Sequence, residues 1–121
     1  MKITRAVEDY LEALLMLEEE GKPLEITEIA KHLNVSKPAA TQMMNELKEN
    51  GFVEKERYGS IQLTEEGRKI GQATLHRHNV LKKLLMSIGV SEELAEEDCC
   101  KIEHVISEET FEKIEDFVNR K

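Results

Sequence analysis

The chain has 121 residues, of which 40% are hydrophobic and 35% charged; this is enough apolar material for one small domain or two very small ones, and it excludes a disordered chain. No run of about 18 apolar residues occurs and the charged start of the sequence has no apolar signal core, so we expect a cytoplasmic protein with no membrane partner. A net charge of −8 excludes a protein that coats nucleic acid by bulk electrostatics, because phosphate contacts dominate such binding.

Periodic apolar side chains predict three helices in the first part of the chain. Two are expected over residues 5–19 and 26–33, where apolar side chains recur at helical spacing. Asn34 follows the second helix at a position suited to a left-handed residue. Ser36 is a good N-cap for the third helix, which Gly51 ends. Two short helices joined by a tight turn, the second well capped, are typical of a helix-turn-helix.

A hairpin is expected directly after these helices. Residues 52–55 and 61–63 are short β-capable runs on either side of a turn at residues 57–60. A helix-turn-helix followed at once by a hairpin is the winged arrangement. We therefore expect a winged helix-turn-helix DNA-binding domain over residues 1–64.

Three more helices are expected in residues 65–121. The first ends at Gly89. The second runs from its N-cap, Ser91, to about Ile106, and the third is capped by Ser107. The predicted fold class is therefore mainly α, with a winged helix-turn-helix followed by a helical domain.

The C-terminal helices together carry more apolar side chains than one small lobe needs, and the last of them contributes four. Its expected inner residues are Phe111, Ile114, Phe117 and Val118. Self-association is the simplest way to cover them, and symmetric dimers are the commonest solution. The alternative is that they pack on the first helix of the same chain. We expect a homodimer, because short chains bury little surface alone.

The sharpest chemical pattern is a thiol, a carboxylate and an imidazole close together in the sequence. Cys100, Glu103 and His104 stand at i, i+3 and i+4, so on a helix they share one face. All three groups are metal ligands, and this spacing lets them converge on one ion. Cys99 points about 100° away from Cys100 on a helix and is expected to be a small buried apolar residue. With no other cysteine in the chain to pair with, both are expected to be reduced thiols.

Three further ligand candidates lie outside this group. Asp9 and Glu12 stand at i and i+3 on the first helix, and His78 lies on the helix after the hairpin. Spacing alone leaves two alternatives open: the carboxylates form a solvated face, and His78 is an ordinary exposed or hydrogen-bonded histidine.

The sequence resembles the diphtheria-toxin-repressor and manganese-transport-regulator family of metal-dependent transcriptional repressors. The stretches that carry the resemblance run through nearly the whole chain and are Glu8–Glu12, Ile29–Ser36, Leu63–Gly67, His76–His78 and Cys100–His104. The resemblance implies a helical metal-binding and dimerisation domain over residues 65–121. The metal ligands that it implies are Asp9, Glu12, His78, Cys100, Glu103 and His104. The DNA contacts that it implies lie on the third helix and the wing and are Ser36, Lys37, Pro38, Ala39, Thr41, Gln42, Lys55 and Arg57.

The chain combines features of two branches of this family. Cys100 resembles the iron branch, whereas Asp9 resembles the manganese branch. The length of the chain also favours the manganese branch, because the iron branch has an additional C-terminal domain. Glu96 and Lys82 stand where the iron branch has the histidine and the glutamate of an ancillary metal site, so the chain departs from that pattern.

We therefore expect a homodimeric, metal-activated repressor that binds double-stranded operator DNA and controls metal-ion homeostasis, and not an enzyme. Oxygen donors outnumber sulfur in the implied ligand set, which favours Mn(II) as the activator and Fe(II) next; Co(II) or Zn(II) can bind in vitro. One alternative is a winged-helix regulator that senses a non-metal ligand. The other is a small metalloenzyme, which is disfavoured because up to six protein ligands leave little room for the open coordination position that a catalytic metal needs.

The expected DNA readout divides between bases and phosphates. Gln42 can pair with adenine and Ala39 can contact a thymine methyl group. Lys37, Lys55 and Arg57 are expected to hold phosphates.

The order of the implied ligands along the chain predicts how the metal acts. Asp9 and Glu12 precede the helix-turn-helix, whereas the other four ligands follow the wing. An ion bound by both sets is expected to tie the DNA-reading part to the dimerising helices. Without the ion, a dimer samples many separations of its recognition helices, and only a fraction is competent to bind DNA.

Overall fold

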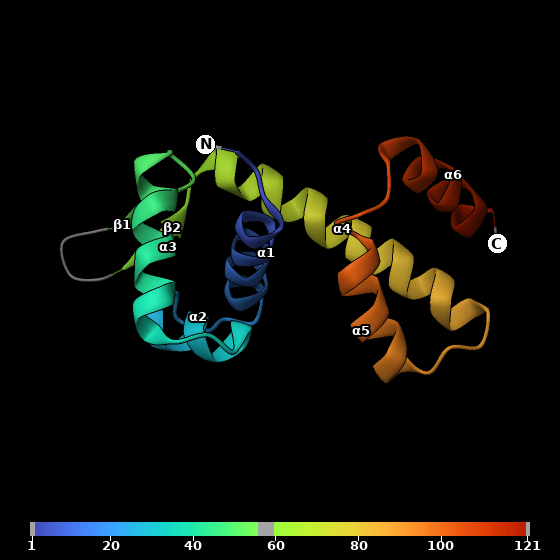
Figure 1. Ribbon diagram of the computed structural model, residues 1–121, viewed down its shortest axis with the longest axis horizontal. Coiled ribbons are helices and arrows are strands. Elements are labelled where there is room, and N and C mark those ends of the chain that lie inside the picture. Colours follow the sequence, from blue (N-terminus) through green and yellow to red (C-terminus); the bar gives the residue numbers. More distant parts are fainter. Residues whose placement is uncertain (1, 56–59, 121) are drawn as a thin grey trace. The chain divides into compact units, whose positions relative to one another are not determined.

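The computed structural model describes residues 2–55 and 60–120 (Figure 1). The helices and strands in these residues are α1 (Arg5–Glu19), α2 (Ile26–Leu33), α3 (Lys37–Glu49), β1 (Val53–Lys55), β2 (Ile61–Leu63), α4 (Glu65–Ser87), α5 (Glu92–Ile102) and α6 (Glu108–Asn119). The predicted fold class, a winged helix-turn-helix followed by a helical segment, is confirmed. None of these helices is both long enough and apolar enough to span a bilayer.

The chain divides into two compact units, residues 1–73 and 74–121, and the boundary falls within α4. We call them unit 1 and unit 2 and describe each by itself. The expected boundary between a DNA-binding domain and a metal-binding domain at residue 64 stays a prediction.

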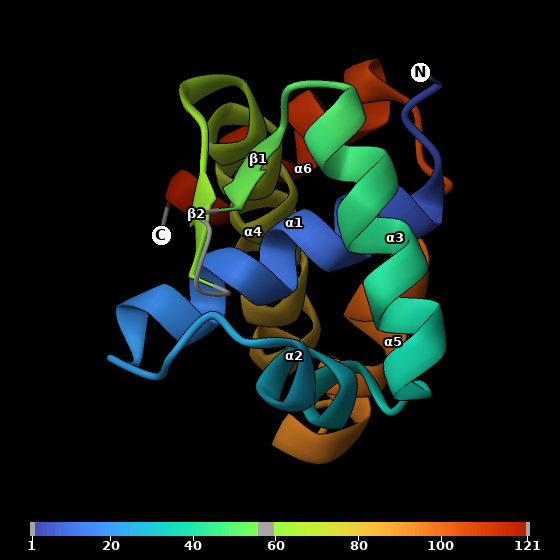
Figure 2. The same cartoon turned by 90° about the vertical axis from the view of Figure 1, so that its left-hand side faces the viewer.

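The helix-turn-helix of unit 1 is formed by α2 and α3. Asn34 ends α2 with a left-handed backbone, φ 55° and ψ 48°, which reverses the chain as the sequence predicts. The side chain of Ser36 then accepts a hydrogen bond from the Ala39 N–H at 3.2 Å and caps α3. α2 packs against both α1 and α3. Figure 2 shows α3 in front of α1, with α2 at the start of α3 and the hairpin at its end.

The wing is a two-stranded antiparallel hairpin. Val53 pairs with Leu63 and Lys55 with Ile61. Val53, Ile61 and Leu63 are buried, whereas the intervening Gln62 is exposed, which is the alternation expected of a half-buried sheet. β1 lies along α3 and β2 along α1. The expected turn at residues 57–60 falls largely outside the described residues.

Close contacts with residues 51 and 52, which directly precede the hairpin, fix the start of α4. The Thr64 hydroxyl donates to the Gly51 carbonyl at 2.6 Å and accepts the Gly67 N–H at 3.1 Å. A Cβ atom at Gly67 would lie 2.0 Å from the Phe52 carbonyl oxygen. Only glycine therefore permits this approach.

Unit 2 is held together by the packing of α6 against α4. Its buried core contains Val80, Phe111 and Val118, against which Leu84, Ile106 and Ile114 pack. The expectation for the last helix is correct for Phe111 and Val118 but wrong for Phe117, which is 49% exposed. The expected end of α5 at about Ile106 is also wrong, because the helix ends at Ile102.

Candidate metal centre

The six predicted metal ligands are divided between the two units. Asp9 and Glu12 lie on α1 in unit 1. In unit 2, α4 carries His78 and α5 carries Cys100, and Glu103 is the C-cap of α5. His104 follows Glu103 in the turn that leaves the helix.

Helical geometry continues just beyond the formal end of α5. Glu103 has φ −57° and ψ −24°, and its N–H donates to the Cys99 carbonyl at 3.0 Å. The i, i+3 relation between Cys100 and Glu103 therefore survives. This places the thiol and the carboxylate on the side of α5 that meets α4.

The four predicted ligands of unit 2 contact one another in series: His104 contacts Glu103, Glu103 contacts His78, and His78 contacts Cys100. The Nδ1 atom of His78 lies 3.2 Å from Glu103 Oε2 and 3.6 Å from Cys100 Sγ. The other carboxylate oxygen, Glu103 Oε1, lies 3.2 Å from His104 Nε2. His78 and Glu103 are only 4% and 1% exposed. A buried imidazole, a buried carboxylate and a half-buried thiol are the kinds of ligand that first-row divalent ions take.

Two residues of this cluster were not predicted as ligands. Cys99 is fully buried, as expected, but its Sγ faces the imidazole of His78, 3.5 Å from Nδ1 and 3.6 Å from Nε2. Glu96 approaches the same ring, with Oε1 3.0 Å from Nε2. The sequence contained one signal for both, since Glu96, Cys99, Cys100 and Glu103 follow one another at steps of three, one and three on a single helix.

The electrostatics of the cluster favour a charged His78 when no metal is bound. Hydrogen bonding to Cys100 and Glu103 raises the pKa of His78 to about 11, although burial opposes the shift. Burial, followed by the negative charges of Cys100 and Glu96, raises the pKa of the Cys99 thiol to about 12. At neutral pH the imidazolium therefore balances Glu103, and an arriving metal ion must displace its proton.

An ion pair borders the cluster. Lys82 Nζ lies 3.0 Å from Glu96 Oε2 and 3.7 Å from Glu92 Oε1. Burial acts to raise the pKa of Glu96, but hydrogen bonds and charge from Lys82 and His78 outweigh it, so the pKa is lowered. Glu96 is thus a carboxylate held between an ammonium group and an imidazole.

The predicted DNA-contacting residues of α3 line its outer side. Lys37, Pro38, Ala39 and Gln42 are exposed and Thr41 is half-buried. The opposite side of the helix is buried through Ala40, Met44 and Leu47. Lys55 is half-buried at the end of β1. Arg57 lies outside the described residues. Contact of these side chains with DNA stays a prediction.

Comparison with known proteins identifies a family for each part of the chain. Residues 2–61 match the family described as iron dependent repressor, N-terminal DNA binding domain. Residues 64–120 match iron dependent repressor, metal binding and dimerisation domain. An uncharacterized HTH-type transcriptional regulator of Methanocaldococcus jannaschii is 36% identical over 120 residues, which cover 98% of this chain and 96% of that protein. The HTH-type transcriptional regulator MntR of Geobacillus kaustophilus is 37% identical over 115 residues, covering 95% and 82%.

Solved structures agree with this assignment. IdeR of T. acidophilum superposes with a TM-score of 0.81 at 26% identity and covers 98% of this chain. A manganese-dependent transcriptional repressor in complex with manganese has the same fold, with a TM-score of 0.86 at 23% identity over 95% of this chain. The chain spans only about half of either structure, 55% and 53%. With its two family domains in order and relatives above 30% identity along nearly its whole length, the chain belongs to the iron dependent repressor family of metal-dependent transcriptional repressors.

Proposed function

We propose that this protein is a homodimeric repressor of metal-ion homeostasis genes that binds operator DNA when a divalent metal is bound. One observation carries the proposal: a winged helix-turn-helix and a buried cluster of metal-ligating groups occur in the same short chain. DNA binding is assigned to residues 1–64, and metal binding and dimerisation to residues 65–121. A protein of this kind acts on DNA in the cytoplasm and performs no chemistry on its metal.

The metal is held by His78, Cys100, Glu103 and His104, with Asp9 and Glu12 assigned as further ligands on the family resemblance. This set of six is rich in hard oxygen donors, which suit Mn(II) and, next, Fe(II). Co(II) and Zn(II) bind the same residues in vitro. The bound ion would supply positive charge and would join the residues that ligate it. The types of these donor atoms and their arrangement determine which ion binds best.

DNA is read by α3 placed in the major groove. Its exposed side offers an amide at Gln42 for adenine and a methyl group at Ala39 for thymine. Lys37, Lys55 and Arg57 hold phosphates, which position the helix without reading sequence. Because the chain carries a net charge of −8, these few cations and the bound metal must offset a repulsive background.

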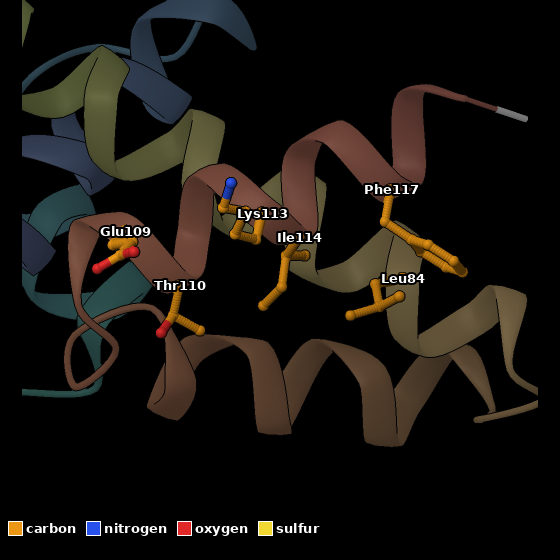
Figure 3. A pocket seen from close by; sticks show the side chains of 6 residues that line it. All are labelled: Leu84, Glu109, Thr110, Lys113, Ile114 and Phe117. Carbon is orange, nitrogen blue, oxygen red and sulfur yellow. The ribbon is translucent and has the colours of Figure 1, made fainter.

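A second copy of the chain covers an apolar groove between α4 and α6. The groove encloses about 400 Å³ and is lined by Leu84, Glu109, Thr110, Lys113, Ile114 and Phe117. Figure 3 shows Leu84, Ile114 and Phe117 along the same hollow. Phe117 is half exposed within one chain, and an isologous dimer would bury it. The family domain that spans these residues is described as a dimerisation domain, which supports this partner.

The proposal is tested by selecting duplexes from a random-sequence library with purified protein and Mn(II). Binding of the selected duplex is then measured under reducing conditions with chelator and with Mn(II), Fe(II), Co(II) or Zn(II). We expect tight binding with Mn(II) or Fe(II) and weak binding with chelator. Equal binding in chelator and in metal would contradict the proposal and favour a regulator that senses a non-metal ligand.

Two matched substitutions on α5 and its C-cap show whether the cluster is the sensor. Glu103→Gln removes a carboxylate that is 1% exposed and touches two histidines. Glu97→Gln removes one charge from the exposed side of the same helix. We expect only Glu103→Gln to abolish the effect of Mn(II) on DNA binding. Asp9→Ala tests the assignment made from the resemblance, and it should abolish the same effect while the protein stays dimeric.

A further inference from the structure

Asn45 lies on the exposed side of α3, one turn beyond Gln42, and is not among the assigned DNA contacts. It stands four residues after Thr41 and three after Gln42, and residues at these spacings are neighbours on a helix surface. The buried side of α3 is formed by Ala40, Met44 and Leu47. Asn45 points about 100–160° away from each of these three residues. Its side chain therefore projects from the side of α3 that carries the proposed base contacts.

The amide of Asn45 makes no hydrogen bond within the part of the chain that the structure describes. Asn50 provides the contrast, because its Nδ2 atom donates to the Glu46 carbonyl at 2.7 Å. An asparagine inside a helix commonly bonds to nearby backbone groups, and it is a weaker helix former than alanine. Asn45 therefore does nothing for the stability of α3, and both its Oδ1 and its Nδ2 are available to a ligand.

The amides of Gln42 and Asn45 are spaced for two separate base pairs. Three residues of an α-helix rise about 4.5 Å, and successive bases of one DNA strand are about 3.4 Å apart. Homeodomains read the major groove from helix positions i, i+3, i+4 and i+7. On α3 the residues with this spacing are Pro38, Thr41, Gln42 and Asn45. The same side continues to Glu49, an exposed carboxylate that DNA phosphates repel.

We propose that Asn45 is a second base-reading residue of α3 and recognises an adenine within two base pairs of the base that Gln42 reads. The inference rests on the proposed function, because it requires α3 to lie in the major groove of operator DNA. The asparagine amide offers an acceptor and a donor side by side. Its Oδ1 accepts a hydrogen bond from the adenine N6 amino group, and its Nδ2 donates to adenine N7. Each half-site then has a second position at which adenine is preferred.

The test compares the base preferences of the wild type, Gln42→Ala, Asn45→Ala and Asn45→Asp, each as the full chain with Mn(II). Binding is measured to the selected duplex and to all of its single-base variants. We expect Asn45→Ala to lose about 5- to 150-fold of discrimination at one position, and Gln42→Ala to lose it at another. Asn45→Asp keeps an acceptor but loses the donor, and carboxylates accept from cytosine N4. Its preference at the first position should therefore change from adenine to cytosine, which a merely structural role would not produce.

Asn50→Ala is the matched control for Asn45→Ala. It makes the same substitution at an exposed residue whose amide is already bonded, about 140° around the helix from Asn45. We expect it to keep the wild-type discrimination at every position. Thermal unfolding followed by circular dichroism should give a midpoint for Asn45→Ala no lower than that of the wild type, since alanine is the better helix former.

Full discrimination at every position in Asn45→Ala, or an equal loss of affinity for all duplexes, would overturn this inference. Either result, beside a loss at one base in Gln42→Ala, contradicts the role of Asn45 and leaves the proposed function intact. DNA binding that ignores metal, beside a loss at one position in Asn45→Ala, contradicts the metal-activated repressor and supports the role of Asn45. A wild type that binds all duplexes alike overturns both.

Discussion

His78 is held by a carboxylate at each of its two ring nitrogens. Glu103 faces Nδ1 and Glu96 faces Nε2, and Lys82 fixes Glu96 from the other side. Glu96 is not one of the assigned ligands, but its carboxylate holds the Nε2 side of the His78 ring and so orients the imidazole. It is therefore a positioning residue for the metal centre.

Replacing this carboxylate is expected to weaken metal binding without removing a ligand. Glu96→Gln keeps the size of the side chain but loses the charge that orients His78, so metal affinity should fall about 10- to 100-fold. A competing chelator dye measures the affinity, and the nitrogen shifts of the imidazole in the metal-bound protein report which ring nitrogen binds the ion. Glu97→Gln, exposed on the same helix, is the control. Unchanged affinity and unchanged nitrogen shifts in Glu96→Gln would show that the contact plays no part in positioning.

The raised pKa of His78 makes the stability of the metal-free protein depend on pH. Its folded-state pKa is about 11, whereas an unfolded chain has a histidine pKa of about 6.5. The stabilisation is therefore complete below pH ~6.5 and is lost as pH rises through the folded value. Urea unfolding with chelator should give a smaller free energy of unfolding at pH 9.5 than at pH 7. His78→Gln should flatten this dependence, and an equal slope in the variant would assign it to other groups.

Helix boundaries were predictable wherever periodicity and capping residues agree. α1 and α2 have the expected bounds, and Ser36, Ser91 and Ser107 cap helices as expected. The end of α5 was not predictable in this way, because apolar spacing continues to Ile106. The chain leaves the helix after Ile102, and Ile106 then packs against the core of unit 2.

The predicted ligands show the same limit. Local spacing predicted that Cys100 and Glu103 share one face of a helix, and both contact His78. The 100° rotation between Cys99 and Cys100 suggested that only one of them could face the cluster. His78 comes from α4, and its Nδ1 atom lies 3.5 Å from Cys99 Sγ and 3.6 Å from Cys100 Sγ, so both thiols reach it. Spacing along one helix cannot predict contacts with a side chain that comes from another helix.

At the start of α4, replacement of Gly67 should reverse the usual effect of removing a helical glycine. Gly→Ala within a helix commonly stabilises it, but here the new Cβ would lie 2.0 Å from the Phe52 carbonyl oxygen. We expect Gly67→Ala to lower the free energy of unfolding by about 1–3 kcal/mol, measured by urea unfolding. Gln72→Ala, on the exposed side of the same helix, should be nearly neutral. A stabilised Gly67→Ala would mean that the approach is not close in solution.

Two substitutions on α3 should separate base reading from phosphate binding. Gln42→Ala should lose about 1–3 kcal/mol of discrimination at one adenine position. Lys37→Ala should weaken binding to all sequences alike and lower the salt slope by about 1. Both are measured on the selected duplex and its single-base variants at several salt concentrations. The same loss of base preference in both variants would contradict this division of roles.

For the whole molecule, the groove between α4 and α6 predicts where two copies meet. Phe117→Glu replaces an apolar ring with a charge in the groove beside Leu84 and Ile114, and burying a charged group opposes association. Sedimentation should show a dimer for the wild type, with or without metal, and a monomer for Phe117→Glu. Asn119→Glu adds the same charge at an exposed position of α6 and should remain dimeric. A dimeric Phe117→Glu would place the interface elsewhere.

The alternation of charge through the metal centre makes the metal concentration at half-occupancy depend on pH. Lys82, Glu96, His78 and Glu103 follow one another as cation, anion, cation and anion, so opposite charges already pair in the metal-free cluster. An ion that binds His78 must therefore displace a proton from the ring. For each proton displaced, a fall of one pH unit raises the metal concentration at half-occupancy about tenfold. The repressor's set point is therefore a ratio of metal to acid, and an acidified cell would derepress its target genes at an unchanged metal level.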